Sequence, residues 1–183
     1  MAVADLADGT IEGPDGPGDG PVEGARTGDV AHFREVLGHF ATGIVVITGA
    51  LDGVPAGLTC QSFVSLSLDP PLVAFCPSKR SSSWRRIDQS GAFCANVLAE
   101  DQEATSRVFA TSGADKFRGV GWRAAETGSP ILNDVLAWVD CRIEARHDAG
   151  DHHIIVGRVV ELEAATRGRP LLAFRGGYGR FDN

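Results

Sequence analysis

One short stretch of the chain concentrates groups that bind anions. Ser78-Lys79-Arg80-Ser81-Ser82-Ser83 places four hydroxyls and two cations just before an expected helix. Backbone N–H groups and the positive end of the helix dipole attract anions such as phosphate at that position. The stretch therefore indicates a phosphate site. It is also compatible with a solvated loop in which Ser81 or Ser83 does no more than cap the helix.

A second group of polar residues follows an expected strand. Thr59-Cys60-Gln61-Ser62 offers hydroxyl and amide groups that can hydrogen-bond the polar edge of a flat heterocycle. Spacing alone does not separate this reading from ordinary polar residues on an edge strand, so both stay open here.

The third candidate is Gly150-Asp151-His152-His153. Adjacent residues of a strand point to opposite faces, so the two histidines cannot bind one metal ion together from that strand. Even with His147 and Asp151 nearby, we expect no metal site. One histidine beside a cofactor either donates a hydrogen bond to a phosphate or an amide, or is simply part of the turn.

Several enzyme motifs are missing from the sequence. It has no Gly-x-Gly-x-x-Gly after a strand, no Walker A loop, no Gly-x-Ser-x-Gly and no His-Glu-x-x-His. Nothing therefore supports a dinucleotide fold of the Rossmann type or a hydrolase. Cys60, Cys76, Cys94 and Cys141 lack the close spacing of zinc ligands, which predicts buried free thiols and a reducing cytoplasm.

Charge and composition divide the chain in two. The net charge of the 183 residues is −7, of which −5 lies in residues 1–28 and −2 in the rest. Residues 1–28 are rich in glycine, proline and acids, which predicts a disordered tail before one domain at residues 29–183. A nearly neutral body argues against a nucleic-acid surface. We see no secretory leader and no apolar run long enough to span a membrane, so we expect a cytoplasmic protein.

The hydrophobic pattern predicts a mainly β domain. Asp29 is a plausible N-cap for a helix that ends near Phe40, and two more short helices are expected, one around Trp84 and one capped by Asp101. Asp52-Gly53 is a hairpin turn signal. The expected strands cover residues 44–48, 57–60, 63–68, 72–76, 93–98, 139–146, 153–160 and 171–174. Many strands with few helices favour a closed antiparallel barrel over a doubly wound sheet.

These features occur together, and in order, in one family. From Phe33 to Phe181 the chain resembles the short-chain NAD(P)H:flavin oxidoreductases, the reductase components of two-component flavin-dependent monooxygenases. The matching stretches are Phe40 to Thr48, Gly57 to Val73, Asn96-Val97-Leu98, Asp115-Lys116-Phe117, Gly150-Asp151-His152 with Gly157-Arg158-Val159, and Pro170-Leu171-Leu172 with Gly176-Gly177-Tyr178.

The resemblance implies a split β-barrel of Greek-key type that forms a homodimer, with a flavin near the subunit interface. The residues it assigns to the isoalloxazine ring are Pro55, Ala56, Gly57, Leu58, Thr59, Gln61 and Ser62. Those it assigns to the ribityl and phosphate end are Cys76, Pro77, Ser78, Ser82 and Ser83. Phe109, Lys116 and Phe117 match positions near the flavin, His152 matches a histidine on the nicotinamide side, and Tyr178 lies near the same pocket.

The activity that the resemblance implies is hydride transfer from NADH to free flavin. Because the flavin supplies the electronics, the protein mainly positions two rings and excludes water. We expect FAD over FMN, no metal, and release of reduced flavin to a partner monooxygenase. NADH is preferred as donor because no basic cluster suits a 2′-phosphate, although Arg175 or Arg180 could serve one. The alternative is a non-catalytic flavin-binding or carrier protein on the same barrel.

Overall fold

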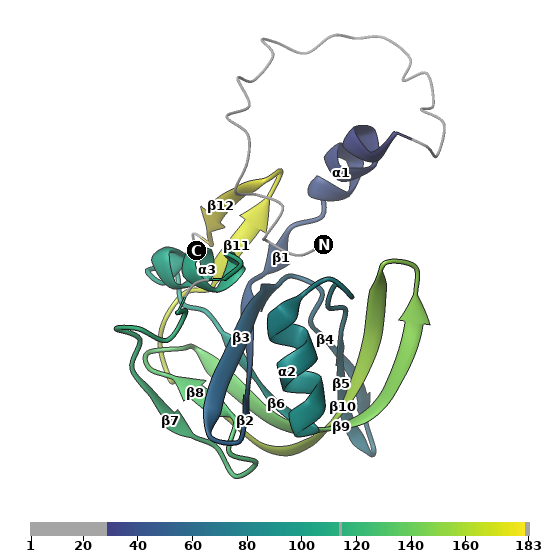
Figure 1. Cartoon of the computed structure of the whole chain (residues 1–183). Helices are drawn as coiled ribbons and strands as arrows, with labels where there is room; N and C mark the ends of the chain where they lie inside the picture. The colour runs from purple at the N-terminus through teal and green to yellow at the C-terminus, as the bar shows by residue number, and fades with distance from the viewer. Residues whose placement is uncertain (1–28, 114, 182–183) are drawn as a thin grey trace, which may run out of the picture.

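A seven-stranded antiparallel sheet forms the body of the protein in the computed structural model (Figure 1). The structure describes residues 29–113 and 115–181, so the predicted disordered tail at residues 1–28 lies outside the described residues. The spatial order of the strands is β3-β2-β6-β9-β10-β5-β4. Their bounds are β2 Val45–Leu51, β3 Val54–Cys60, β4 Val64–Leu68, β5 Pro71–Phe75, β6 Ala92–Val97, β9 Ala137–Ala149 and β10 His152–Ala164.

Two hairpins in this sheet follow directly from the sequence. Asp52 and Gly53 have φ angles of 52° and 75°, so both central residues of the β2–β3 turn adopt the left-handed conformation that Asp-Gly favours. β9 and β10 pair along their length, as the alternating pattern predicts. A Cβ on Gly157 of β10 would lie 2.4 Å from the ring of Phe93, so only glycine lets β6 and β10 pack here.

The main core fills the concave side of the sheet. Helix α2 (Ser82–Ser90) lies in the curl of the strands (Figure 1) and buries Trp84 and Ile87. Trp84 meets Phe75 edge-on at 5.5 Å between ring centroids, and Phe75 in turn contacts Phe93. The edge strands β3 and β4 do not pair with each other in the described residues. The mainly β fold with few helices is confirmed, but the expected closed barrel is split along this edge.

Two smaller sheets complete the fold. β1 (Thr42–Gly43), β11 (Leu171–Phe174) and β12 (Gly177–Arg180) form a three-stranded sheet beside a second apolar cluster. β7 (Trp122–Ala124) and β8 (Pro130–Leu132) form a short hairpin. Neither β12 nor this hairpin was predicted, because both segments lack an apolar period of two.

The other two helices differ from expectation in detail. α1 (Val30–Gly38) begins as predicted, since the Asp29 carboxylate accepts hydrogen bonds from the N–H groups of Ala31 and His32. It ends before Phe40. α3 (Glu103–Ala110) starts later than predicted, and Asp101 does not cap it. Gln102 precedes the helix, and its side chain instead bonds Ala99 and Asn133.

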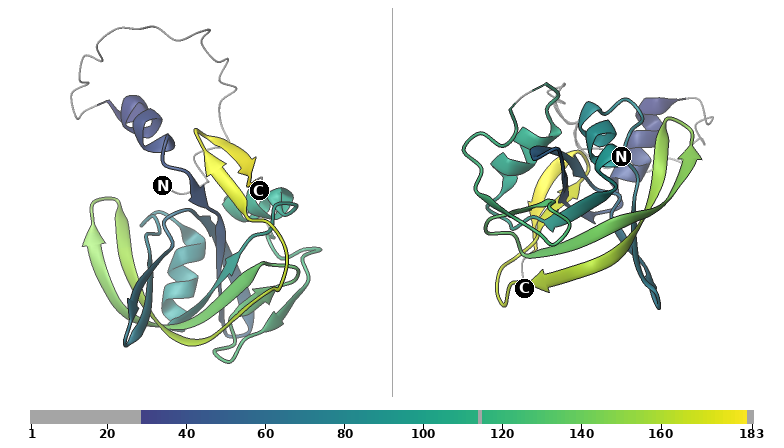
Figure 2. Two further views of the ribbon diagram at one scale, coloured as in Figure 1. Left: turned by 180° about the vertical axis from the view of Figure 1, so that it is seen from behind. Right: turned by 60° about the horizontal axis from the view of Figure 1, so that its bottom comes forward.

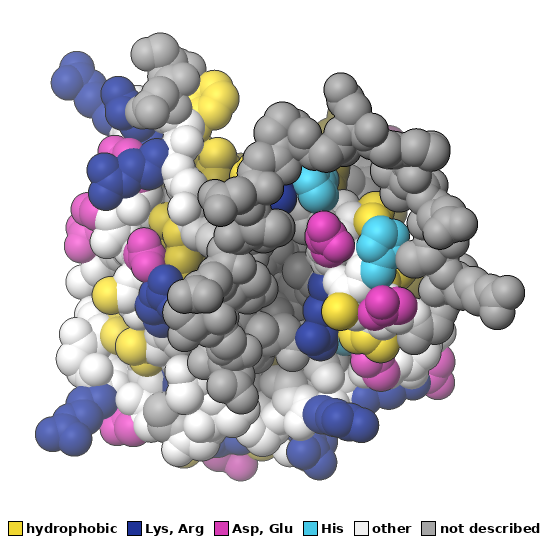
Figure 3. Space-filling model, turned by 90° about the horizontal axis from the view of Figure 1, so that it is seen from above, with side chains coloured by type: hydrophobic (Ala, Val, Ile, Leu, Met, Phe, Trp, Pro, Cys, Tyr) yellow, Lys and Arg dark blue, Asp and Glu magenta, His cyan; other side chains and the backbone are white. Residues whose placement is uncertain are grey.

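α1 projects from the body, as Figure 1 and the left view of Figure 2 show. None of its residues is buried in the chain. Seen from above, hydrophobic side chains are exposed between charged ones on this side of the molecule (Figure 3).

All four cysteines are free thiols, and three of them, Cys60, Cys94 and Cys141, are buried as predicted, while Cys76 is half-buried. No helix among the described residues is long and apolar enough to cross a membrane.

Candidate active site

Two adjoining cavities, of about 370 and 360 Å³, lie at the start of α2. They share Ser82, Ser83 and Lys116, so the three side chains form a common wall. Predicted site residues lining the first cavity, which we call the arginine cavity, are Leu58, Thr59, Ser78, Ser82, Ser83, Phe109, Lys116 and His152. Those lining the second, which we call the β3 cavity, are Pro55, Ala56, Gly57, Ser82, Ser83, Lys116 and Phe117. The structure thus gathers most predicted residues, from distant parts of the chain, around these two adjoining cavities.

The serines at the start of α2 have separate roles. Ser81 is the N-cap, and its hydroxyl accepts a hydrogen bond of 3.1 Å from the N–H of Trp84. This decides between the two caps that the sequence allowed. Since Ser81 caps the helix, the hydroxyls of Ser82 and Ser83 are not needed to cap it, and both line the cavities.

Lys116 uses its ammonium group to hold the shared wall together. Nζ donates to the carbonyl oxygens of Gly57 (3.0 Å) and Phe109 (2.9 Å) and to Oγ of Ser83 (3.2 Å). An ammonium has three donors, so protein acceptors occupy them all. Because Ser83 accepts from Lys116, its own hydroxyl proton is directed elsewhere. Burial lowers the pKa of Lys116 from its ordinary value.

Strand β3 supplies a close-packed wall. A Cβ on Gly57 would lie 2.5 Å from the ring of Phe109, so glycine is required for that ring to reach the cavity. Phe109 in turn meets Phe117 edge-on at 5.1 Å. The hydroxyl of Thr59 donates to the carbonyl of Ser106 at 2.6 Å, so this side chain holds α3. Thr59 therefore lines the cavity without offering its hydroxyl proton to a ligand.

The tip of the β9–β10 hairpin forms the opposite wall of the arginine cavity. His152 lies there with Nδ1 2.7 Å from a carboxylate oxygen of Asp151. This hydrogen bond lowers the pKa of Asp151. Ser78 forms a β-bridge with His152, and the N–H of His153 donates to the carbonyl of Pro77. The loop Ser78–Ser83, which we call the serine loop, and His152 are therefore fixed to each other through the backbone.

His153 points away from this cavity. Its Nδ1 lies 3.4 Å from a carboxylate oxygen of Asp148, which also pairs with Lys79 at 2.8 Å. The two histidines thus occupy different environments, as alternation along a strand requires. No group of three or more His, Cys, Asp or Glu side chains in the described residues is placed to hold a metal ion.

Five predicted residues do not line either cavity: Gln61, Ser62, Cys76, Pro77 and Tyr178. Ser62 accepts a hydrogen bond of 2.8 Å from the N–H of Cys76, and Gln61 accepts one from Thr42. These contacts join the end of β3 to the segment after β5. Pro77 is buried. The hydroxyl of Tyr178 lies 3.0 Å from that of Ser106, and Arg107 covers its ring at 4.7 Å.

Sequence reasoning missed several residues of the site. Arg34, Arg80, Ser112 and Asp151 line the arginine cavity, and Arg86 lines the β3 cavity. Arg80 lies within Ser78–Ser83 and Asp151 within Gly150–His153, so these two motifs mark the neighbourhood of the cavity but not which of their side chains line it. Nothing local marked Arg34, because α1 reaches the cavity only through the tertiary fold.

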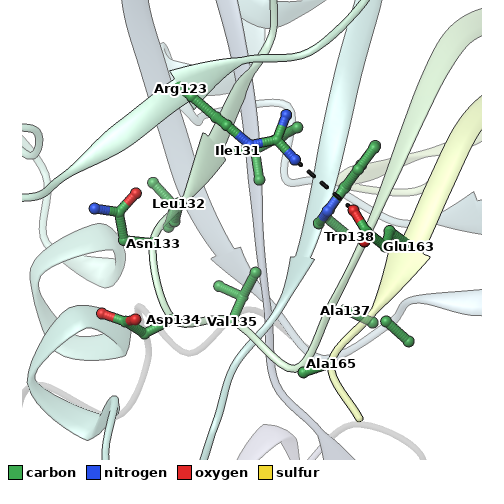
Figure 4. Close-up of a pocket in the computed structure, with 11 residues that line it drawn as sticks. Arg123, Ile131, Leu132, Asn133, Asp134, Val135, Ala137, Trp138, Glu163 and Ala165 are labelled. Atoms are coloured by element: carbon green, nitrogen blue, oxygen red, sulfur yellow. Dashed lines mark ion pairs between the residues drawn. The ribbon is translucent and has the colours of Figure 1, made fainter.

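A separate cavity of about 330 Å³ lies at the other end of β9 and β10 (Figure 4). Arg123 points toward Glu163, 4.0 Å away, and covers the ring of Trp138 at 5.1 Å. Arg123, the cation of this cavity, already faces the carboxylate of Glu163, and no predicted site residue lines the cavity. It is therefore not the candidate active site.

The chemistry of the two adjoining cavities fits a flavin. Pro55, Ala56 and Phe117 give the β3 cavity apolar surface suited to a flat ring. The common wall of Ser82, Ser83 and Lys116, which we call the serine wall, gives hydroxyl donors for a phosphate. Arg34 and Arg80 add positive charge beyond that wall. An elongated molecule with a ring at one end and phosphate at the other matches this order of groups.

Comparison with known proteins agrees with this geometry. Residues 37–182 match the flavin reductase like domain. The chain is 52% identical over 161 residues to HsaB, the reductase subunit of a flavin-dependent monooxygenase of Rhodococcus jostii, covering 88% of this chain and 82% of that protein. It is 43% identical over 151 residues to the FMN reductase (NADH) SmoA of Agrobacterium fabrum, covering 82% of this chain and 85% of that protein.

A solved structure shares the fold. The NADH:FAD oxidoreductase SgcE6 of Streptomyces globisporus is 33% identical and matches with a TM-score of 0.84, covering 90% of this chain and 100% of that chain. The same protein in complex with NAD and FAD fragments matches with a TM-score of 0.83, covering 88% of this chain and 98% of that chain. Since the family match spans most of the chain and a relative is 52% identical to it, this protein belongs to the flavin reductase-like family.

Proposed function

We propose that this protein is a flavin reductase that uses NADH to reduce free flavin, FAD in preference to FMN, and hands the reduced flavin to a separate monooxygenase. The observation that carries the proposal is the common wall of Ser82, Ser83 and Lys116. It lies between the β3 cavity, to which β3 and Phe117 give apolar surface, and the arginine cavity, which holds Arg34 and Arg80. The alternative is a carrier that binds flavin without reducing it.

The proposed roles follow from the groups that each cavity offers. Pro55, Ala56, Gly57 and Phe117 would flank the isoalloxazine ring. Ser82 and Ser83 would donate hydrogen bonds to the phosphate, assisted by the N-terminus of α2. Gln61, Ser62, Cys76 and Pro77 would act indirectly, because they shape the strand ends around the cavities. Tyr178 would position α3, whose Phe109 lines the space.

Hydride transfer needs the two rings in contact and water excluded. The flavin, when bound, supplies the electron-accepting ring, so the protein needs no nucleophile. His152 would hold the nicotinamide nucleotide, since its ring lines the cavity while Asp151 engages Nδ1. A carrier has no use for a histidine held in that way.

A homodimer is the second part of the proposal. Helix α1 buries no residue in its own chain, and Phe33, Val36 and Leu37 are 62%, 50% and 51% exposed. A nine-residue helix is not stable without tertiary packing, so its apolar side requires a partner surface. A second copy of the chain is the proposed partner.

Sedimentation tests the homodimer with a matched pair of variants. Phe33 and Leu162 have equal exposed fractions of 62% but lie on α1 and on the far end of β10. Phe33→Asp should give monomers, and Leu162→Asp should leave the dimer intact. A monomeric parent protein, or equal behaviour of the two variants, contradicts the proposed interface.

The compartment and the oxygenase partner complete the proposal. Four free cysteines suit a reducing cytoplasm, because disulfides are rare in that compartment. HsaB is named as the reductase subunit of a flavin-dependent monooxygenase, and this supports a partner of the same type here.

One assay separates reductase from carrier. NADH oxidation is measured with FAD, FMN and riboflavin added in turn to the purified protein. A reductase turns over many equivalents of NADH, with FAD the best acceptor. A carrier binds flavin in a titration but leaves NADH unchanged, and that result would reject the enzyme.

A further inference from the structure

The arginine cavity holds more positive charge than one flavin phosphate needs. Its lining includes Arg34 from α1, Arg80 from the serine loop, and Lys116. The acidic side chain that lines it is Asp151, which is already hydrogen-bonded to His152. These three cations outnumber the one carboxylate, so the cavity carries a net positive charge.

Lys116 does not account for this excess. Its three donors are taken by Gly57, Phe109 and Ser83, so it strengthens the wall and has no donor left for a ligand. The cations that can meet a new anion are the two guanidinium groups. Each has five N–H donors, so a guanidinium can keep one partner and still bind phosphate in a bidentate manner.

The position of the two arginines is also informative. Both line the arginine cavity, and neither lines the β3 cavity. If a flavin ring lies against β3 and its first phosphate lies at Ser82 and Ser83, any group beyond that phosphate enters the space between Arg34 and Arg80. FMN ends at that first phosphate. FAD continues through a diphosphate, and NADH also contains one.

We propose that Arg34 and Arg80 form a second anion position that recognises the diphosphate of a dinucleotide, so that the site selects dinucleotides over FMN. This inference rests on the proposed function, because it takes the serine wall as the place of the first phosphate. The shared chemistry is a diphosphate, and the two possible sources are FAD and NADH.

The test uses Arg34→Gln, Arg80→Gln and a matched control. Arg118→Gln removes the same charge two residues from Lys116 at an exposed side chain that lines neither cavity. Dissociation constants for oxidised FAD and FMN are measured without NADH. The KM for NADH is then measured with FMN as acceptor, so that NADH is the sole dinucleotide present.

In the two cavity variants, we expect the affinity for at least one dinucleotide to fall about tenfold or more, the size of a lost hydrogen bond to a charged group. The dissociation constant for FMN should change less than about twofold, and Arg118→Gln should behave as the parent. If the FAD arm responds, FAD supplies the diphosphate; if only the NADH arm responds, NADH does.

Two results overturn the inference: FMN weakened as much as the dinucleotides, or no dinucleotide weakened in either variant. Failure of the proposed function looks different. In that case the parent protein itself neither binds flavin nor oxidises NADH, before any variant is compared.

Discussion

Helices α1 and α2 have equal length and opposite surroundings. Each has nine residues and a polar N-cap whose side chain accepts a backbone N–H, Asp29 for α1 and Ser81 for α2. α2 buries Trp84 and Ile87 at 2% and 0% exposure inside the curled sheet, whereas α1 buries nothing. Local sequence signals therefore specify both helices equally well and say nothing about what covers them.

The two helices nevertheless line the same cavity. The first turn of α2 supplies Ser82 and Ser83 to the arginine cavity, and α1 supplies Arg34. A helix anchored in the core thus provides one part of the site, and a helix that buries none of its residues in its own chain provides another. This predicts that core stability and nucleotide selection respond to different mutations.

The largest expected effect is on the anchored helix. Trp84→Ala should lower the free energy of unfolding by about 3–5 kcal/mol, the usual cost of deleting a buried aromatic side chain. Phe33→Ala in α1 should change the unfolding of the isolated subunit by no more than about 0.5 kcal/mol, since its side chain is 62% exposed.

Denaturant unfolding at several protein concentrations checks this pair. Any cost of Phe33→Ala should depend on concentration, because it arises from association, while the cost of Trp84→Ala should not. Equal, concentration-independent losses would mean that α1 packs on its own chain, and the contrast between the helices would be wrong.

The next effect is on the start of α2. Replacing Ser82 and Ser83 together by Ala should weaken flavin binding by about 1.5–3 kcal/mol for each hydrogen bond lost to a charged phosphate. The helix should survive, since Ser81 is the cap. Ser90→Ala is the control, because Ser90 lies in the last turn of α2 and bonds Ile87 and Ala92. If a flavin titration gives an unchanged affinity, the serine loop does not bind the phosphate and only caps the helix.

A smaller and more selective effect is expected at the hairpin tip. His152→Ala should raise the KM for NADH or slow hydride transfer while flavin affinity stays close to that of the parent. His153→Ala is the matched control, because that histidine pairs with Asp148 outside the cavity. Stopped-flow flavin reduction, a flavin titration and a thermal melt distinguish the outcomes. Unchanged kinetics with lower stability would make His152 structural and favour the carrier.

How far the sequence predicts this fold depends on how local each signal is. The Asp52-Gly53 turn, the Asp29 cap and the alternation from Cys141 to Arg146 in β9 are local, and the structure confirms all three. Asp140, expected on the polar side of the same strand, is instead buried and accepts hydrogen bonds from Thr127. β12 was missed because Gly177-Tyr178-Gly179-Arg180 has no apolar period and pairs only with β11. The strand pattern alone predicted a closed barrel, because residue types do not reveal which strands remain unpaired, whereas the split barrel that the family resemblance implies is the fold observed.

The candidate site shows the same limit. Residues in quoted motifs, such as Ser82 and Lys116, line the cavities because short segments carry them there. Gln61 and Tyr178 also lie in stretches that match the family, but they line neither cavity. Their polar groups hydrogen-bond Thr42 and Ser106 instead. Arg34 could not be found in advance, because it reaches the site through the placement of a whole helix.

The smallest expected effect concerns the segment before α1. The composition of residues 1–28, rich in glycine, proline and acids, predicts that they add nothing to the folded domain. A chain that begins at Asp29 keeps the N-cap of α1 and should keep its melting temperature, its mass in solution and its rate of NADH oxidation. Loss of several degrees would show that the segment packs on the domain. Loss of dimer mass with unchanged melting would show that it, and not only the apolar side of α1, holds the two copies together.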